Sequence, residues 1–89
     1  MARLIFTQQL ARFTSVPQVD TDAERLRAGL ESAFALNPAL RGYVLDDQGH
    51  LRENVEVFID ARRCSDRVAL DDALTPDSTV YILQALSGG

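Results

Sequence analysis

Residues 79–89 read TVYILQALSGG, and the way in which they end the chain is the most informative feature of the sequence. β-Branched and aromatic residues predict a strand over 79–85. The turn-forming run Thr75-Pro76-Asp77-Ser78 comes directly before it, and Ser87-Gly88-Gly89 follows almost at once. With glycine at about 7% of residues, two terminal glycines arise by chance in about 0.5% of chains, so their meaning depends on the fold around them.

The N-terminal half of the chain combines short strand-like segments with one helix. Thr21 and Glu24 match a capping box, which predicts that the helix begins at residue 22. Asn37-Pro38 predicts that it ends at residue 36, because a residue before proline avoids the α conformation. Apolar residues share one face of this helix and are expected to be core: Leu26, Leu30, Ala33 and Phe34. Strands are expected over 3–7, 16–19 and 41–45, with Leu10 and Phe13 anchoring the loop after the first.

The C-terminal half begins with a turn over 46–49, in which Gly49 takes the positive-φ position. Residues 55–60 then alternate, so that Val55, Val57 and Ile59 face the core and Glu56, Phe58 and Asp60 face away. A turn over 60–63, an extended piece around Val68 and a single helical turn over 70–74 are expected before the last strand. The resulting order, β-β-α-β-β-β, predicts an α+β fold in which one main helix packs on one face of a mixed sheet of four to five strands.

Length, composition and charge limit the class of protein. Eighty-nine residues, 46% hydrophobic and 25% charged, predict one globular domain, placed over 1–86 with a flexible tail over 87–89. The net charge of -4 argues against nucleic-acid binding, which needs basic residues to neutralise phosphates. The start of the chain lacks the long apolar region of a signal peptide, and no apolar run approaches the roughly 20 residues that cross a bilayer. We therefore expect a cytoplasmic protein with no membrane partner.

The element order and the terminal glycines together resemble the MoaD/ThiS family of ubiquitin-like (β-grasp) sulfur carriers over essentially the whole chain. The residues that carry the resemblance are Leu4-Ile5-Phe6, Leu10-Ala11-Arg12, the helix end at Asn37-Pro38, residues 49–59 and residues 80–89. Asp60-Ala61 stands where the family usually has Asn-Gly, and Gln84-Ala85 replaces a common Pro-Pro. The first departure changes turn chemistry without disturbing the fold, and the second leaves the branch of the family open.

The resemblance implies a function for the carboxyl end of Gly89. In the family, an ATP-using adenylyltransferase of the ThiF/MoeB type, related to ubiquitin-activating enzymes, adenylates this carboxylate. A sulfur donor then converts it to a thiocarboxylate, which passes its sulfur to a biosynthetic enzyme. The carrier itself is no enzyme and binds no cofactor or metal. Gly88 and Gly89 suit this role because a backbone without Cβ atoms passes through a narrow channel.

Two other functions share this chemistry. One is a ubiquitin-like modifier that is joined to target proteins through Gly89. The other is the small subunit of a two-protein synthase such as molybdopterin synthase, with the tail inserted in the larger subunit. All nine basic residues are arginine, so the chain offers no lysine for linkage to itself.

A docking surface for the partner is expected beside the tail. If Val57 and Ile59 face the core, Phe58, Tyr81 and Leu83 lie on the outer face of the sheet. Exposed apolar clusters of this kind often mark partner surfaces, and Leu86 and Ser87 extend this one toward the glycines. The competing interpretation is that these side chains are scattered and covered by arginine stems.

Other reactive residues give weaker signals. Cys64 follows Arg62-Arg63, which would lower a thiol pKa, but a lone cysteine is more often a small buried hydrophobe. His50 has neither a nucleophile nor metal ligands near it in the sequence. The acid pairs Asp46-Asp47 and Asp71-Asp72 are interpreted as solvated loop residues or caps. There is no phosphate-binding loop and no metal-binding motif.

Overall fold

The computed structural model describes residues 1–13 and 17–84 of the chain. Its elements, in chain order, are β1 (Ala2–Thr7), the 3₁₀ helix η1 (Gln8–Phe13), β2 (Gln18–Thr21), α1 (Leu26–Leu36), α2 (Pro38–Val44), β3 (Val55–Ile59), β4 (Arg62–Arg63) and β5 (Thr79–Gln84). The expected α+β class is confirmed. None of the helices in these two ranges is both long enough and apolar enough to cross a membrane.

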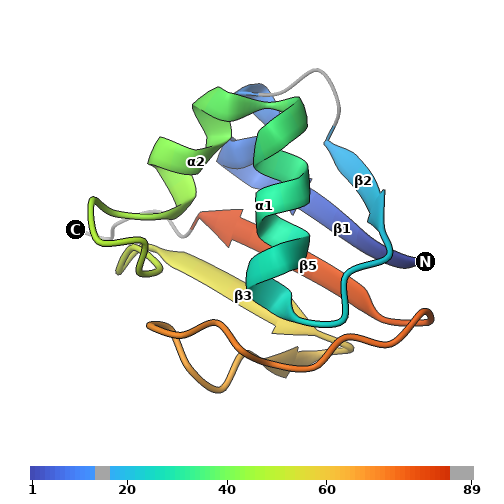
Figure 1. The fold of residues 1–89 in the computed structure, drawn as a ribbon. Helices are drawn as coiled ribbons and strands as arrows, with labels where there is room; N and C mark the ends of the chain where they lie inside the picture. The colour runs from blue at the N-terminus through green and yellow to red at the C-terminus, as the bar shows by residue number, and fades with distance from the viewer. Residues whose placement is uncertain (14–16, 85–89) are drawn as a thin grey trace.

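The sheet has five strands in the order β2-β1-β5-β3-β4, so the last strand in sequence lies in the middle. β1 and β5 are parallel, and every other neighbouring pair is antiparallel. Figure 1 shows both α-helices on one face of the sheet, with the N-terminus at the end where β5 begins. The C-terminal end of β5 lies at the opposite end of the sheet, where Thr7 pairs with Leu83 and Val55 with Gln84.

The core lies between this sheet and the helices. The alternation expected for residues 55–59 is confirmed, and the same period of two orients β1 and β5. Burial of one large apolar side chain stabilises the fold by about 1.5–3 kcal/mol relative to its exposure. The largest fully buried side chains are Phe6, Leu4, Leu10, Leu26, Leu30, Leu40, Ile59, Leu70, Ile82, Val44, Val55 and Val57.

The first two strands and the loop between them differ in detail from the prediction. Residues 8–13 form a 3₁₀ helix instead of an open loop, and Leu10 anchors it with no exposed surface. The second strand runs from Gln18 to Thr21 rather than over 16–19, because its ladder pairs Gln18 with Ile5 and Thr21 with Ala2. Pro17 lies just before the strand, where its missing N–H costs no ladder hydrogen bond.

The predicted capping box is wrong. Helix α1 begins at Leu26 instead of residue 22, and its N-cap residue Arg25 makes no side-chain cap. The Thr21 hydroxyl oxygen instead accepts a hydrogen bond from the Ala23 N–H at 3.1 Å, which forms a local turn before the helix. The predicted helix end at Leu36 is confirmed, and the Asn37 N–H donates to the Ala33 carbonyl.

A distant segment caps the helix in place of Thr21. The Leu26 and Arg27 N–H groups donate to the carbonyl oxygens of Asp72 and Leu70, each at 2.9 Å. These carbonyls belong to residues 64–75, which we call the strap and which run without a helix or strand between β4 and β5. Backbone groups 43 and 46 residues apart therefore satisfy donors that a helix N-terminus otherwise leaves unpaired.

Two further predictions within the strap are wrong. Val68 lies in a turn instead of an extended piece, because the Asp66 carboxylate accepts hydrogen bonds from the Val68 and Ala69 N–H groups. No helical turn forms over 70–74, where Leu70 adopts a φ of 54° and Ala73 bridges Arg25. Buried Leu70 therefore keeps the strap in a left-handed bend that an isolated leucine avoids.

Residues 41–45 are not a strand, and this prediction is also wrong. They belong mostly to α2, which begins with Pro38 at its first turn. Proline is favoured there because its fixed φ suits a helix and its missing N–H is not needed. Leu40 and Val44 are four residues apart and both are fully buried, so a helix places them together on the core side.

The turns predicted at Gly49 and over 75–78 are confirmed, whereas the turn predicted over 60–63 is shorter, because Arg62 and Arg63 form β4. Gly49 has a φ of 78°, and the Ser78 N–H donates to the Thr75 carbonyl at 3.0 Å. Asp60 and Ala61 have φ values of 50° and 70°, the left-handed values that a two-residue hairpin turn requires. The tight β3–β4 turn therefore forms without the Asn-Gly pair that favours it.

Candidate functional site

The outer face of the sheet brings together the three predicted docking residues. Phe58 and Tyr81 are directly paired across β3 and β5, and Tyr81 is paired on its other side with Ile5 of β1. Leu83 follows two residues after Tyr81 and therefore lies on the same face. Tyr81 is 43% exposed, while the other three side chains are half-buried. We call Ile5, Phe58, Tyr81 and Leu83 the apolar row.

Arginine covers one side of the apolar row. Arg63 is paired with Phe58 across β3 and β4, and its guanidinium carbon lies 5.9 Å from the centre of the Phe58 ring. The Glu56 carboxylate is 3.4 Å from Arg63 Nε and also 3.4 Å from Arg67 Nη1. Each interpretation of the outer face therefore describes part of it. The apolar side chains lie together, and the guanidinium of one arginine lies over the cluster on its β4 side.

Leu83 connects the apolar row to the end of the last strand. It pairs with Glu56 on β3 and Thr7 on β1, one residue before β5 ends at Gln84. The other predicted partner-binding and working residues, Leu86, Ser87, Gly88 and Gly89, lie outside the described residues. Their roles remain predictions, as does the division of the chain at residue 86.

The residues interpreted as non-functional have structural partners. Cys64 is 7% exposed, and burial, helped by the nearby Asp72 carboxylate, raises the pKa of its thiol. Asp72 accepts a hydrogen bond from the Ser65 N–H, and Asp46 accepts from the Gln48 and His50 N–H groups. Within residues 1–13 and 17–84, no group of three or more His, Cys, Asp or Glu side chains is arranged to hold a metal ion.

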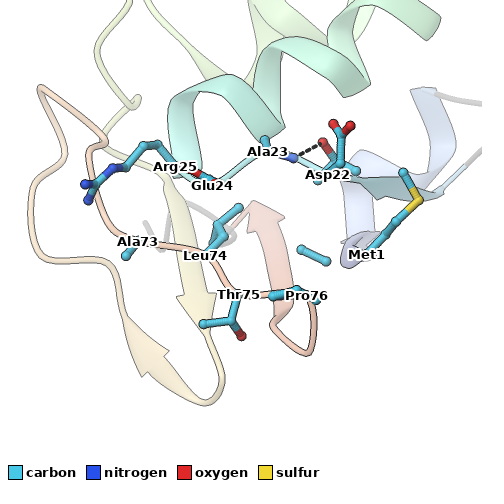
Figure 2. Close-up of a pocket in the computed structure, with 11 residues that line it drawn as sticks. Met1, Asp22, Ala23, Glu24, Arg25, Ala73, Leu74, Thr75 and Pro76 are labelled. Atoms are coloured by element: carbon cyan, nitrogen blue, oxygen red, sulfur yellow. Dashed lines mark hydrogen bonds between the residues drawn. The ribbon is translucent and has the colours of Figure 1, made fainter.

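A hollow of about 470 Å³ lies at the other end of the molecule (Figure 2). Met1, Ala2, residues 21–25 and residues 73–76 line it, with the carboxylates of Asp22 and Glu24 among them. It adjoins the turn that begins β5, whereas the predicted tail follows the end of that strand. The six residues of β5 rise about 3.3 Å each, so this hollow is separate from the surface around Leu83.

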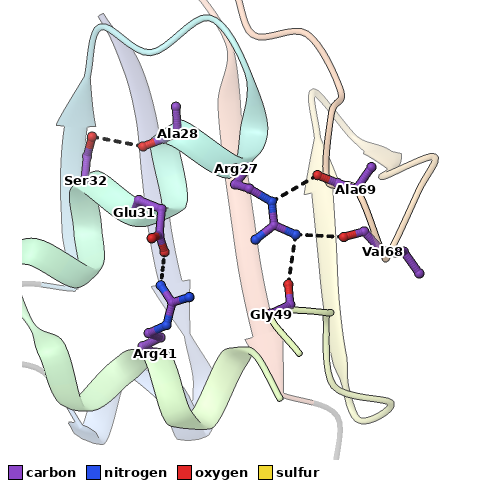
Figure 3. Close-up of polar contacts among 8 residues, drawn as sticks. All are labelled: Arg27, Ala28, Glu31, Ser32, Arg41, Gly49, Val68 and Ala69. Atoms are coloured by element: carbon purple, nitrogen blue, oxygen red, sulfur yellow. Dashed lines mark hydrogen bonds and ion pairs between the residues drawn. The ribbon is translucent and has the colours of Figure 1, made fainter. Parts of the chain in front are cut away.

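Arg27 is an organising residue that sequence reasoning missed. It lies on α1, and its guanidinium donates to three carbonyl oxygens: Ala69 at 3.1 Å, Gly49 at 2.8 Å and Val68 at 2.7 Å (Figure 3). These contacts hold the strap and the turn at residue 49 against the helix. No local pattern indicates them, because the acceptors lie 22–42 residues away. Figure 3 also shows Arg41 of α2 paired with Glu31 of α1.

Comparison with solved structures identifies the fold, whereas comparison of sequences does not. No protein-family model matches the chain, and no curated protein matches its sequence. Small archaeal modifier protein 1 (SAMP1) from Haloferax volcanii is 21% identical, with a TM-score of 0.81 over 99% of this chain and 98% of its own. A chain of the BexX/CysO complex from Amycolatopsis orientalis is 13% identical, with a TM-score of 0.83 over all of both chains. Urm1 from Sulfolobus solfataricus is 13% identical, with a TM-score of 0.70 over 92% of this chain and 97% of its own.

These likenesses define the class of protein by its fold. The chain has the β-grasp fold of ubiquitin-like proteins, as the resemblance seen in its sequence predicted. The solved structures that share it include small archaeal modifier proteins, Urm1 and a chain of the BexX/CysO complex.

Proposed function

We propose that this chain is a sulfur carrier whose Gly89 carboxylate becomes a thiocarboxylate. One observation supports this most directly: the central strand β5 ends at Gln84 beside the partly exposed apolar row, and the sequence continues from there to Gly88-Gly89. Five residues follow Gln84 and, when fully extended, reach at most about 17 Å. That reach is sufficient for a terminal carboxylate to enter a partner's active site while the sheet docks outside it. The likeness to the CysO complex, which contains a sulfur carrier, favours the same function.

The proposed chemistry has two steps, both on a partner enzyme. A ThiF/MoeB-type adenylyltransferase joins the Gly89 carboxylate oxygen to the α-phosphorus of ATP and releases pyrophosphate. Hydrosulfide from a sulfur donor then attacks the carbonyl carbon, AMP leaves with the bridging oxygen, and a thiocarboxylate remains. This chain contributes no catalytic side chain to either step. It acts as a protein cosubstrate that positions one carboxylate, and ATP is bound by the partner.

Glycine at the end of the chain suits both steps. A Cβ atom on residue 89 would lie next to the carbonyl carbon that is attacked. Reactions that depend on close approach lose about 100-fold in rate when the reacting groups are misplaced by about 1 Å. Gly88 lets the backbone adopt conformations that other residues avoid, which helps the tail to follow a narrow channel.

Intact-mass measurement tests the proposal. The purified protein is incubated with ATP, sulfide and each ThiF/MoeB-type adenylyltransferase of its own organism. We expect a gain equal to the exchange of one oxygen for one sulfur that depends on ATP, and an alkylating reagent should then add the mass of its alkyl group to the thiocarboxylate. An unchanged mass with every such enzyme would contradict the sulfur-carrier function.

A modifier function is the second candidate, favoured by the likeness to SAMP1 and Urm1. It requires the same activation of Gly89, followed by transfer to a lysine of another protein. Conjugates of the tagged chain in cell lysate that resist reduction and denaturation would support it. A synthase subunit would instead co-purify tightly with one larger partner. Intact mass, conjugates in lysate and co-purification therefore distinguish the three functions.

A further inference from the structure

We propose that Arg63 is a specificity-determining residue of the docking surface, and that it recognises carboxylates on the activating enzyme. The inference rests on the proposed function and adds the chemistry of the partner's surface to it. It begins from an asymmetry of the outer face. The apolar row is bordered on its β4 side by Arg63, whereas on the β2 side Arg3 is paired with Asp20.

The contacts of Arg63 hold it in place and leave much of it open. Its guanidinium lies over the Phe58 ring, and Nε faces the Glu56 carboxylate at 3.4 Å. The Arg63 side chain is nevertheless 68% exposed. Among the described residues, its two terminal nitrogens have no hydrogen-bond acceptor. They therefore offer a planar, positively charged fork toward solvent, the geometry that pairs with a carboxylate through two parallel bonds.

Prior ordering makes this arginine better suited to binding than an unrestrained one. A side chain that is free in solution loses rotamer freedom when it is immobilised at an interface, and this loss weakens binding. Stacking on Phe58 and pairing with Glu56 meet part of that cost before the partner arrives. The Glu56 pair is open to water, so it contributes little free energy itself and does not compete strongly with a new carboxylate.

Local charge indicates the chemistry of the occupant. Arg63 presents an exposed positive charge on the outer face, whereas the chain as a whole has a net charge of -4. An acidic partner surface fits this site and is repelled by most of the rest of the molecule, so charge favours one orientation. A nucleic acid is a poor fit, because its phosphates require a broad basic array. Tyr81 and Phe58 supply the apolar contacts beside the charged ones.

Arg62 provides a matched control on the neighbouring residue. It is exposed and has the same charge, but it pairs with Ile59 and therefore lies on the opposite face of β4. Arg63→Glu and Arg62→Glu change the net charge equally, so long-range attraction falls by the same amount in both. Only the first removes the fork beside Phe58 and Tyr81.

The experiment measures thiocarboxylate formation by steady-state kinetics with the enzyme that modifies the wild-type protein. We expect Arg63→Glu to raise the KM for the carrier about tenfold or more with little change in kcat, and Arg62→Glu to raise it less than threefold. Added salt should raise the wild-type KM more steeply than that of Arg63→Glu. Circular dichroism and thermal unfolding confirm that both variants are folded.

The possible results of this experiment separate the role of Arg63 from the proposed function. Equal effects of the two substitutions, or no effect of either, would overturn the role of Arg63 while wild-type thiocarboxylation leaves the proposed function standing. Absence of product from the wild-type protein with every such enzyme would overturn both.

Discussion

The two faces of the sheet are made from alternate residues of the same strands, yet their surroundings differ. On the inner face, Val57 and Ile59 are buried. Backbone carbonyls of the strap accept hydrogen bonds from α1 on this side of the sheet, two from its first N–H groups and two from the Arg27 side chain. On the outer face, Phe58 and Tyr81 pair with residues of neighbouring strands, and among the described residues the Arg63 guanidinium lies over the Phe58 ring. The inner face is thus specified for stability, and the outer face retains apolar area that the fold does not use.

The difference separates what the fold needs from what the proposed function needs. Substitutions on the inner face should lower stability and leave the activation reaction unchanged in the molecules that remain folded. Substitutions on the outer face and in the tail should have the opposite effect. The predictions below test this separation, beginning with the largest expected effect.

Gly89→Ala should lower the rate of thiocarboxylate formation about 100-fold or more without changing stability, because the added methyl group lies beside the reacting carbonyl. The measurement is intact mass against time with the activating enzyme, together with thermal unfolding. Ala35→Gly, a substitution at an exposed helix position, serves as a control for handling and purity. A Gly89→Ala protein that is modified at the wild-type rate would contradict the proposed role of Gly89 in thiocarboxylate formation.

Neighbouring residues of β3 sharpen the comparison between the faces. Ile59→Ala should cost about 2–5 kcal/mol in the free energy of unfolding, because Ile59 is 1% exposed and its loss leaves a cavity. Phe58→Asp should cost about 1 kcal/mol and raise the KM for the activating enzyme about tenfold. Urea unfolding and steady-state kinetics measure the two quantities. Losses of stability of the same size would show that the outer face is structural too.

Arg27 tests whether the strap depends on this one side chain. Arg27→Met keeps the apolar stem but removes three hydrogen bonds to carbonyls, and we expect a loss of about 1–3 kcal/mol in unfolding free energy. Arg41→Met is the matched control, since it breaks a pair with Glu31 in which both side chains are 47% exposed. That substitution should cost about 1 kcal/mol or less. Equal losses would contradict the organising role of Arg27.

Acid should lower the stability of the protein in part through the loop carboxylates of Asp46 and Asp66. Backbone N–H groups donate to two carboxylates, from His50 and Gln48 to Asp46 and from Ala69 and Val68 to Asp66, and lower both pKa values below 3.8. A lowered folded-state pKa contributes stability that is present above about pH 3.8 and is lost as the pH falls through the folded value. We expect the double variant Asp46→Asn and Asp66→Asn to show a shallower loss of Tm below pH 4. Identical slopes for the variant and the wild type would refute this.

Local sequence predicted those parts of the fold that depend on near neighbours. The alternation over 55–59, the turn at Gly49 and the helix end before Pro38 were confirmed, because period and turn chemistry act within a few residues. The juxtaposition of Phe58, Tyr81 and Leu83 also followed from alternation once the two strands were paired. The error at 41–45 was avoidable, since Pro38 and the spacing of Leu40 and Val44 are themselves helical signals.

The start of α1 was not predictable from its own residues. Thr21 and Glu24 formed a plausible capping box, yet the strap supplies carbonyls at Leu70 and Asp72 that satisfy the first helical N–H groups. A backbone cap of this kind depends on chain packing and leaves no pattern in the helix sequence. The arginine contacts of the candidate site, Arg63 with Phe58 and Glu56, likewise required the position of β4.

The sequence by itself determined the alternation over 55–59, the turn at Gly49 and the end of the main helix, because these depend on local periodicity and turn chemistry. Tertiary structure alone decided that β5 lies in the middle of the sheet, that the strap caps α1 and that Arg63 borders the apolar row. These features arise from contacts between residues distant in sequence, whose pairing depends on how the whole chain buries its apolar surface and satisfies its backbone hydrogen bonds.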